Sequence, residues 1–183
     1  MISSEILNVL NNYLTDQNQF DQDPTRPRSK SNYTSVRSLT RKIPTEINRF
    51  IDTGEYYCKG SAGEGNFNEV PWVGVFDREI TLSARKGYYI VFLFNAEMTG
   101  VYLRLVLGWT QYAELYNGRN RLSKARDHIK EHSKMAKELL RSTQGFSVGE
   151  IDLGATNTLG KGYEKGGIIY KYYPSNNLPA DNE

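Results

Sequence analysis

Four short runs of β-branched, aromatic and aliphatic residues follow one another in the middle of the chain, and they constrain its fold most. Each run is bounded by Gly, Asn or charged residues, and the runs are 55–59, 71–76, 88–94 and 101–107. Such runs are typical of β-strands. The third is continuously apolar, as a central strand would be, and the connection 95–100 has the length of a hairpin loop. The sequence therefore predicts a mostly antiparallel sheet that is curved or forms a partial barrel.

Helical spacing appears on both sides of these runs. Apolar residues recur at helical intervals over 2–14, which predicts an N-terminal helix. Residues 15–45 are polar at first, contain prolines and are then basic, so we expect a basic loop or arm, with a second short helix over 43–51. A long basic helix is predicted over 119–141, with Gly145 as a stop signal soon after it.

The remaining C-terminal residues predict two more strands and a tail. The runs 148–153 and 167–173 have strand composition, and 174–183 is polar and acidic, which indicates a loose end. A length of 183 residues suits one domain. We therefore predict a single α+β domain over 1–183, with its core over 55–173 and flanking helices.

Composition excludes several classes of protein. One cysteine excludes a disulfide framework and a zinc site built only from cysteine. No apolar run reaches the roughly 18 residues that a membrane helix requires. The first residues lack the basic and apolar regions of a signal peptide. These features predict an intracellular protein without a membrane span.

The net charge of +2 hides two basic stretches. Residues 24–45 contain six Lys or Arg and no Asp or Glu, and residues 119–141 contain eight basic and three acidic residues. A solvated arm and a phosphate-binding arm are equally good interpretations of the first stretch. The long helix either contacts phosphates as well or braces the sheet.

Patterns that could indicate an enzyme are incomplete. His128, Glu131 and His132 match a zinc-peptidase spacing, but they lie on a basic helix without a further acidic ligand. Asp77 and Glu79 lack the spacing of a nuclease metal site. The glycines of 60–65 do not continue into a nucleotide-binding Gly-Lys-Ser/Thr. We therefore expect no catalytic residues, no metal ligands and no cofactor, while a metal-dependent nuclease, a zinc hydrolase and a protein- or RNA-binding module stay as alternatives.

A glycine-containing loop leads directly into a strand that begins with a tryptophan. The segment Gly63-Glu-Gly-Asn-Phe-Asn-Glu-Val-Pro-Trp72 places a flexible loop beside Trp72. A Trp at such a position is either a core anchor or one wall of a cavity for a flat ring.

The glycine-to-tryptophan stretch resembles the McrB N-terminal domain family, whose members read DNA for restriction systems that act on modified cytosine. The matching residues are Gly63-x-Gly65-Asn66-Phe67-x-x-Val70-Pro71-Trp72. The resemblance extends to 86–94, 101–103 and 162–173, and it covers roughly residues 56–178.

This resemblance implies a domain that flips a modified cytosine of duplex DNA into a pocket. It implies pocket walls at Trp72, Leu93 and Tyr163, with Tyr89 beside them. The loop that enters the DNA would comprise Gly63, Glu64, Gly65, Asn66 and Phe67. Candidates for phosphate contacts are Lys59, Arg37, Arg41, Lys42, Lys161 and Lys165.

The loop departs from the family at Glu64. In the best-known member an aromatic residue between the two glycines fills the gap left by the flipped base. Here either another residue, such as Phe67, fills the gap, or the loop works differently, for example with Glu64 pairing with a cytosine amino group or with the orphan base. The resemblance further implies two partners, a GTPase motor segment and a nuclease subunit, and a location in the prokaryotic cytoplasm. It implies that this chain, an excised domain or a short protein, binds DNA and does not cut it.

Overall fold

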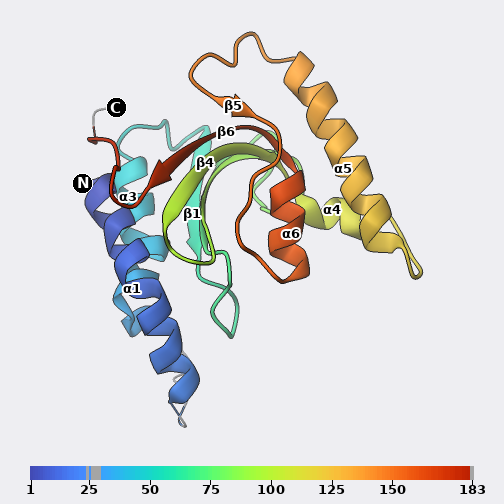
Figure 1. Cartoon of the computed structure of the whole chain (residues 1–183). Helices are drawn as coiled ribbons and strands as arrows, with labels where there is room; N and C mark the ends of the chain where they lie inside the picture. The colour runs from blue at the N-terminus through green and yellow to red at the C-terminus, as the bar shows by residue number, and fades with distance from the viewer. Residues whose placement is uncertain (24, 26–29, 182–183) are drawn as a thin grey trace.

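The computed structural model describes residues 1–23, 25 and 30–181, and within them six strands form one antiparallel sheet. The strand order is β1-β2-β3-β4-β6-β5, and the sheet curves without closing into a barrel (Figure 1). The α+β class is confirmed. The strands are β1 (Tyr56–Ser61), β2 (Trp72–Asp77), β3 (Tyr88–Phe94), β4 (Gly100–Leu107), β5 (Ser147–Val148) and β6 (Gly167–Pro174).

Helices cover both faces of this sheet. The N-terminal helices lie on its convex side, α6 lies within its concave side, and α5 extends along the opposite flank (Figure 1). The helical segments are α1 (Ile2–Gln22), η1 (Lys30–Asn32), α2 (Thr34–Arg37), η2 (Ser38–Lys42), α3 (Ile43–Ile47), α4 (Trp109–Glu114), α5 (Arg121–Glu138) and α6 (Thr158–Lys165).

The alternation of side chains along the strands builds two cores on opposite faces of the sheet, and a third core joins α4 and α5 to the ends of β4 and β6. Val73 and Phe94 face the N-terminal helices and pack among residues of α1 and η2. Trp72, Val91 and Leu93 point to the opposite, concave face, where they join residues of the 151–155 segment and α6. Because successive strand residues point to opposite faces, β2, β3 and β4 each contribute to both of these cores.

The N-terminal region is more helical than the sequence predicted. The helix predicted over 2–14 continues to Gln22, and most described residues of the expected loop or arm over 15–45 are helical. The polar extension of α1 is held by two buried side chains, Asp16 and Phe20. The Asp16 carboxylate accepts hydrogen bonds from the backbone and hydroxyl of Ser35, which joins α1 to α2. Arg26 and Arg28 of the basic stretch lie outside the described residues.

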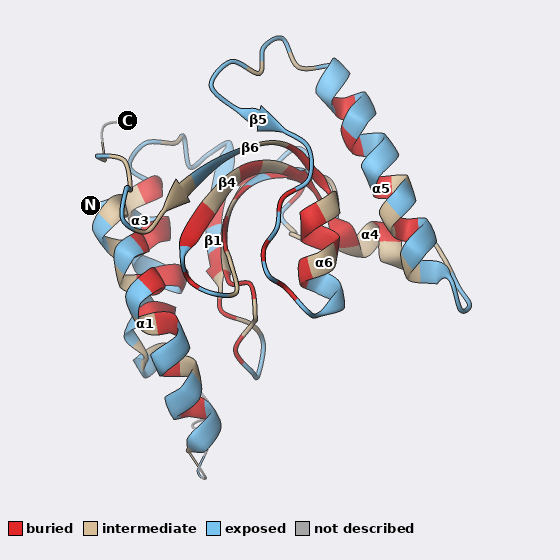
Figure 2. Ribbon diagram, in the orientation of Figure 1, coloured by how far each residue is buried: buried red, intermediate tan, exposed pale blue. Residues whose placement is uncertain are grey.

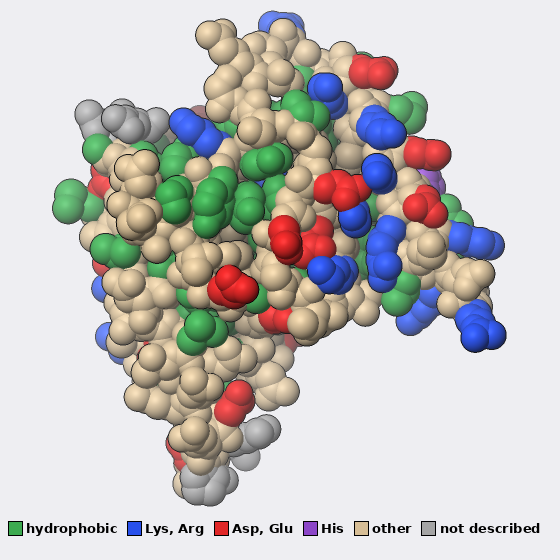
Figure 3. Space-filling view, in the orientation of Figure 1, with side chains coloured by type: hydrophobic (Ala, Val, Ile, Leu, Met, Phe, Trp, Pro, Cys, Tyr) green, Lys and Arg blue, Asp and Glu red, His purple; other side chains and the backbone are tan. Residues whose placement is uncertain are grey.

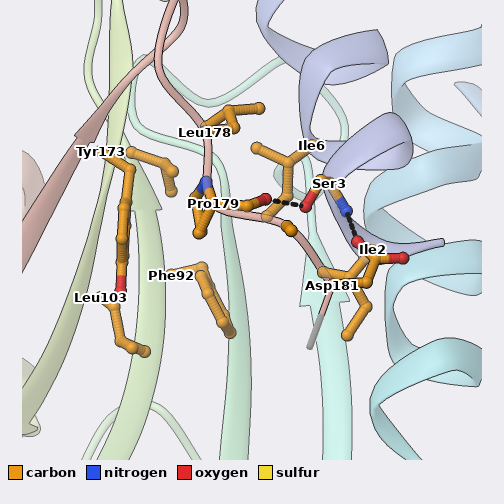
Figure 4. Close-up of a pocket in the computed structure, with 11 residues that line it drawn as sticks. Ile2, Ser3, Ile6, Phe92, Leu103, Tyr173, Leu178, Pro179 and Asp181 are labelled. Atoms are coloured by element: carbon orange, nitrogen blue, oxygen red, sulfur yellow. Dashed lines mark hydrogen bonds between the residues drawn. The ribbon is translucent and has the colours of Figure 1, made fainter. Parts of the chain in front are cut away.

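Two expectations about the C-terminal region are also corrected. The strand predicted over 148–153 pairs with β6 only at Ser147–Val148, and its later residues Ile151 and Leu153 are buried without a ladder of their own. The tail, expected to be loose, docks on α1. The Ser3 backbone amide donates to the Asp181 carboxylate at 2.7 Å, and the Ser3 hydroxyl donates to the Pro179 carbonyl at 2.6 Å (Figure 4).

The long basic helix is confirmed as α5. One stripe of α5, which includes Ala125 and Ile129, is buried, and most of the remaining helix is exposed (Figure 2). Basic side chains gather over it on the surface (Figure 3). No helix among the described residues has both the length and the apolar character needed to cross a bilayer.

Candidate functional site

A cavity of about 320 Å³ lies where the glycine loop, the start of β2 and α6 meet. Two of the predicted walls, Trp72 and Tyr163, line it together with the loop residues Gly63 and Glu64. The other lining residues are Ser61, Asn68, Ala84, Arg85, Thr110 and Leu159. The structure therefore brings part of the predicted loop and part of the predicted pocket to one place.

Trp72 is held by the sheet and remains partly exposed. It follows Pro71 at the first position of β2 and is paired with Ser61 on one side and Leu93 on the other. Its indole meets the Phe76 ring edge-to-face, with centroids 6.3 Å apart. An aromatic side chain fixed in this way can offer a flat surface to a ligand with little loss of rotamer freedom.

Unlike the predicted walls Trp72 and Tyr163, Leu93 and Tyr89 are buried behind the cavity surface. Both are buried, at 0% and 3% exposure, and neither lines the cavity. The Tyr89 hydroxyl donates to the Ala84 carbonyl at 2.9 Å, and Ala84 itself lines the cavity. Leu93 and Tyr89 therefore lie beneath the cavity and support its walls.

Tyr163 is positioned by a buried arginine that the sequence analysis missed. Arg104 of β4 is 1% exposed, and its Nη1 donates to the Tyr163 carbonyl at 2.7 Å while its Nη2 donates to the Gly149 carbonyl at 3.2 Å. Burial lowers the pKa of Arg104 to about 10. Burial also raises the pKa of Tyr163 to about 12, although an interaction with the Tyr89 hydroxyl lowers it in part. The one arginine within an otherwise apolar strand run was the available signal.

The glycine loop has a backbone that its glycines make possible. Gly63 and Gly65 have φ angles of +96° and +73°, in the left-handed region that L side chains rarely adopt. A Cβ on Gly63 would also come within 2.7 Å of the Asn68 side chain, whereas Gly65 faces open space. Glu64, Gly65 and Asn66 form the exposed tip of the loop.

Lys30 binds the neck of the loop from the N-terminal layer. Its ammonium group donates to three backbone carbonyls, those of Ala62, Gly63 and Asn66, at 3.0, 2.6 and 2.6 Å. Burial lowers the pKa of this ammonium group. The sequence showed Lys30 only as one charge of a basic stretch, whereas its three hydrogen bonds hold the backbone of the glycine loop in place.

Glu69 binds the other arm of the loop to the start of α6. Its carboxylate accepts hydrogen bonds from the Thr156 backbone amide at 2.7 Å, the Thr156 hydroxyl at 2.8 Å and the Asn157 backbone amide at 3.0 Å. The loop and the helix that carries Tyr163 are thus fixed relative to each other. No local pattern signalled this contact, because its partners are distant in sequence.

Phe67 does not belong to the exposed tip. It is 8% exposed, and its ring packs against Tyr13, Phe20 and Tyr33 with centroid distances of 5.2, 5.4 and 5.7 Å. The expectation that Phe67 could fill the gap of a flipped base conflicts with this position. Moving the ring into DNA would open a cavity in the core.

The six candidates for phosphate contacts fall into two groups. Three of them have carboxylate partners: Lys42 with Glu5, Lys161 with Glu164 and Lys165 with Glu150. The ion pairs found among the described residues do not include the other three, which are exposed: Lys59, Arg37 and Arg41. Lys59 lies on β1, two residues before Ser61 of the cavity lining. Of the three candidates without an ion pair among the described residues, Lys59 is the closest to the glycine loop in sequence. The phosphate contacts themselves stay a prediction.

Neither the alternative nuclease site at Asp77 and Glu79 nor the alternative zinc site at His128 and His132 is completed by a further metal ligand among the described residues. Asp77 accepts a hydrogen bond from the Glu79 backbone amide at 2.9 Å, which is a turn contact. Among residues 1–23, 25 and 30–181, no group of three or more His, Cys, Asp and Glu side chains could hold a metal ion.

A second cavity, of about 220 Å³, lies between α1, the sheet and the C-terminal tail (Figure 4). Its lining is mainly aliphatic and includes Ile6, Leu103 and Leu178. It lies on the face of the sheet that the N-terminal helices cover, and no residue of the glycine loop lines it. The cavity beside Trp72 is the candidate site because the predicted walls Trp72 and Tyr163 and the loop residue Glu64 line it.

Comparison with known proteins gives one match. The family model described as MrcB-like, N-terminal domain matches residues 9–183, which is most of the chain. Neither the search of curated proteins nor the search of solved structures finds a match.

Proposed function

The chain belongs to the MrcB-like N-terminal domain family, and from this premise we propose that it reads a modified cytosine flipped out of duplex DNA for a restriction system. Membership in the family is consistent with a DNA-recognition module that has no catalytic role of its own. The observation that carries the finer proposal is that Trp72, Tyr163 and the glycine loop line one cavity of about 320 Å³. This volume lies at the small end of the range for ligand pockets.

The energetics favour an aromatic cavity for this task. Extruding a base costs a few kcal/mol of lost pairing and stacking. Stacking on an aromatic side chain returns about 1–3 kcal/mol per base. Trp72 supplies the exposed ring, and Tyr163 supplies a second wall that Arg104 holds in place. A methyl group on an enclosed base can be contacted on all sides, which is impossible within the stack.

The loop tip approaches the DNA in this proposal, and Glu64 is its distinguishing residue. A carboxylate is a poor substitute for a stacked base, but it is an acceptor for the donors on a base edge. The base left unpaired opposite a flipped cytosine is a guanine, whose Watson–Crick edge carries N–H donors. We therefore assign Glu64 to the orphan guanine. Phe67 has no part in the loop contact, because it is held in the core.

A panel of duplexes that differ only in one cytosine tests the proposal. The duplexes carry cytosine, 5-methylcytosine or 5-hydroxymethylcytosine at one site, and affinity is measured over a range of salt concentrations. We expect tighter binding to a modified duplex, over a salt-dependent background from phosphate contacts. Equal affinity for all duplexes at every salt concentration would refute the reading of modification.

Trp72→Ala is the variant that tests the cavity itself. It should abolish the preference for the modified duplex and keep most of the weak nonspecific binding. Tyr88→Ala is the matched control, because Tyr88 is an exposed aromatic residue of β3 that does not line the cavity. A plasmid-nicking assay with Mg²⁺ or Mn²⁺ and competition by RNA would detect the alternative nuclease or RNA-binding functions.

The wider setting is part of the same proposal. We assign the GTPase motor and the nuclease to other segments or subunits, and the location to the prokaryotic cytoplasm. Pull-down of this chain with a motor subunit in the presence of modified duplex tests the assembly.

A further inference from the structure

We propose that His128 and His132 form a two-histidine chelate for a divalent transition-metal ion on the surface of α5. The two rings lie one helical turn apart, on one face of the helix. They are the only two histidines of the chain. This site is separate from the DNA-binding cavity and does not depend on the proposed function.

The two ring nitrogens already have the spacing of a chelate. Nε2 of His128 and Nε2 of His132 are 3.1 Å apart. Two nitrogens that each lie about 2.05 Å from a tetrahedral ion are separated by about 3.3 Å. On binding, the spacing between the two nitrogens would therefore change by only a few tenths of an ångström, while the rings turn to direct both lone pairs at the ion.

Both rings are oriented from behind by tyrosines of another element. The Tyr112 hydroxyl lies 2.8 Å from Nδ1 of His132, and the Tyr116 hydroxyl lies 3.0 Å from Nδ1 of His128. Tyr112 belongs to α4 and Tyr116 follows it, so both are independent of α5. Histidine ligands of metal sites are usually oriented in this way, by a hydrogen bond at the nitrogen that does not bind the metal.

The proton inventory of the pair balances in both states. A hydrogen bond between the two Nε2 atoms requires that one carries a proton and the other accepts it, which two neutral rings satisfy as opposite tautomers. With a metal, both Nε2 lone pairs bind the ion, and both rings carry their proton on Nδ1. Both tyrosine oxygens then accept these protons in hydrogen bonds. Starting from two neutral rings, one ring would change tautomer, and the number of protons on the pair would stay the same.

The surroundings define the class of ion. The pair borders a cavity of about 280 Å³ that Gln111 and Leu115 also line. No third His, Cys, Asp or Glu joins the pair within the described part of the chain, so water would fill the other positions. Two imidazole nitrogens favour Cu²⁺, Ni²⁺ and Zn²⁺, which bind nitrogen strongly, over Mg²⁺, which requires oxygen ligands.

Calorimetric titration of the untagged chain tests the proposal, because a histidine tag would mask the site. We expect one Ni²⁺ or Zn²⁺ per chain and no Mg²⁺. His128→Gln and His132→Gln should each weaken Ni²⁺ binding at least tenfold. Tyr112→Phe should weaken it by about tenfold, the lower end of the effect of such supporting contacts. Equal affinity of the wild type and both histidine variants would overturn the proposal.

Glu131→Gln is the matched control, since Glu131 lies between the two histidines on the same helix. It should retain the wild-type affinity, and a tenfold loss there would point to carboxylate binding instead. A measurement on the wild type covers the case in which a variant misfolds. In NMR spectra, substoichiometric Cu²⁺ should broaden the ring signals of both histidines before others. If these signals stay sharp, the proposal is wrong.

Discussion

Glu69 and Thr156 are joined across 87 residues of sequence, because one carboxylate oxygen of Glu69 accepts hydrogen bonds from both the backbone amide and the hydroxyl of Thr156. The other oxygen accepts from the Asn157 amide, immediately before α6. This contact connects the glycine loop to the helix that carries Tyr163. The glycine loop and α6, which both line the candidate cavity, are therefore fixed to each other by the Glu69 carboxylate.

The Glu69 anchor predicts a specific loss of stability in acid. Burial raises the pKa of Glu69, but the hydrogen bonds from Asn157 and Thr156 outweigh it and leave the pKa below its ordinary value. The folded state thus binds this proton less readily than the unfolded state. The contribution is present above about pH 4.5 and is lost as the pH falls through the folded-state pKa. Urea unfolding of the wild type and Glu69→Gln should show a shallower acid dependence for the variant; parallel profiles would contradict this.

Phe67 is predicted to act through stability and not through direct DNA contact. Phe67→Ala should lower the free energy of unfolding by about 3–5 kcal/mol, because it removes a buried ring from an aromatic cluster. Asn66→Ala, at the adjacent exposed position, should change it by about 0.5 kcal/mol or less. Chemical denaturation measures both. A stable Phe67→Ala protein that has lost only DNA binding would show that the ring belongs to the loop tip after all.

Glu64 is predicted to oppose the background affinity for DNA. Its exposed carboxylate would lie close to phosphates of like charge, so Glu64→Gln should tighten binding to unmodified duplex by about two- to fivefold at low salt. The gain should disappear at high salt. Glu55→Gln, at the opposite end of β1, is the control and should have no effect. An unchanged affinity for Glu64→Gln would place the loop tip away from the DNA backbone.

The buried tyrosines predict a loss of stability in alkali. Burial raises the pKa of Tyr163 to about 12 and that of Tyr89 well above 10. The unfolded chain therefore ionises first, and stability falls as the pH rises above about 10. Tyr163→Phe should reduce this slope in thermal unfolding followed from pH 8 to 11. Absorbance of tyrosinate in the folded wild type should show that these two residues do not ionise near pH 10.

The strands could be predicted from sequence because their signal is local. The run 88–94 and the run 101–107 became β3 and β4 almost residue for residue. The second half of α1 could not be predicted from sequence, because its polar residues are held in the helix by the contact of Asp16 with Ser35. Helix α6 was missed because Gly160 and Gly162 argue against a helix. A Cβ on Gly162 would overlap the Trp109 indole, so close packing explains the glycine.

The residues of the candidate cavity were also singled out only where their signal is local or follows from the family resemblance. Trp72 was identified because a Trp beside a glycine loop is a local pattern, and Tyr163 followed from the family resemblance. The roles of Lys30, Glu69 and Arg104 could not be identified, because each acts through contacts with backbone atoms that are remote in sequence. The segments that cover the concave face decide which predicted walls line the cavity and which are buried beneath it. The path of these segments depends on tertiary contacts that the local sequence does not reveal.

The loop between Ala62 and Glu69 is held in place at both ends. At its start the Ala62 carbonyl accepts a hydrogen bond from the ammonium group of Lys30, and at its end the Glu69 carboxylate accepts one from the Thr156 backbone amide. Only the three residues 64–66 at its tip are exposed, and the Asn66 carbonyl of this tip is also bound by Lys30. Most of the conformational entropy of the loop has therefore been lost on folding, before any encounter with DNA. A probe that is already rigid gives up little freedom on binding, so more of each contact at the tip appears as affinity.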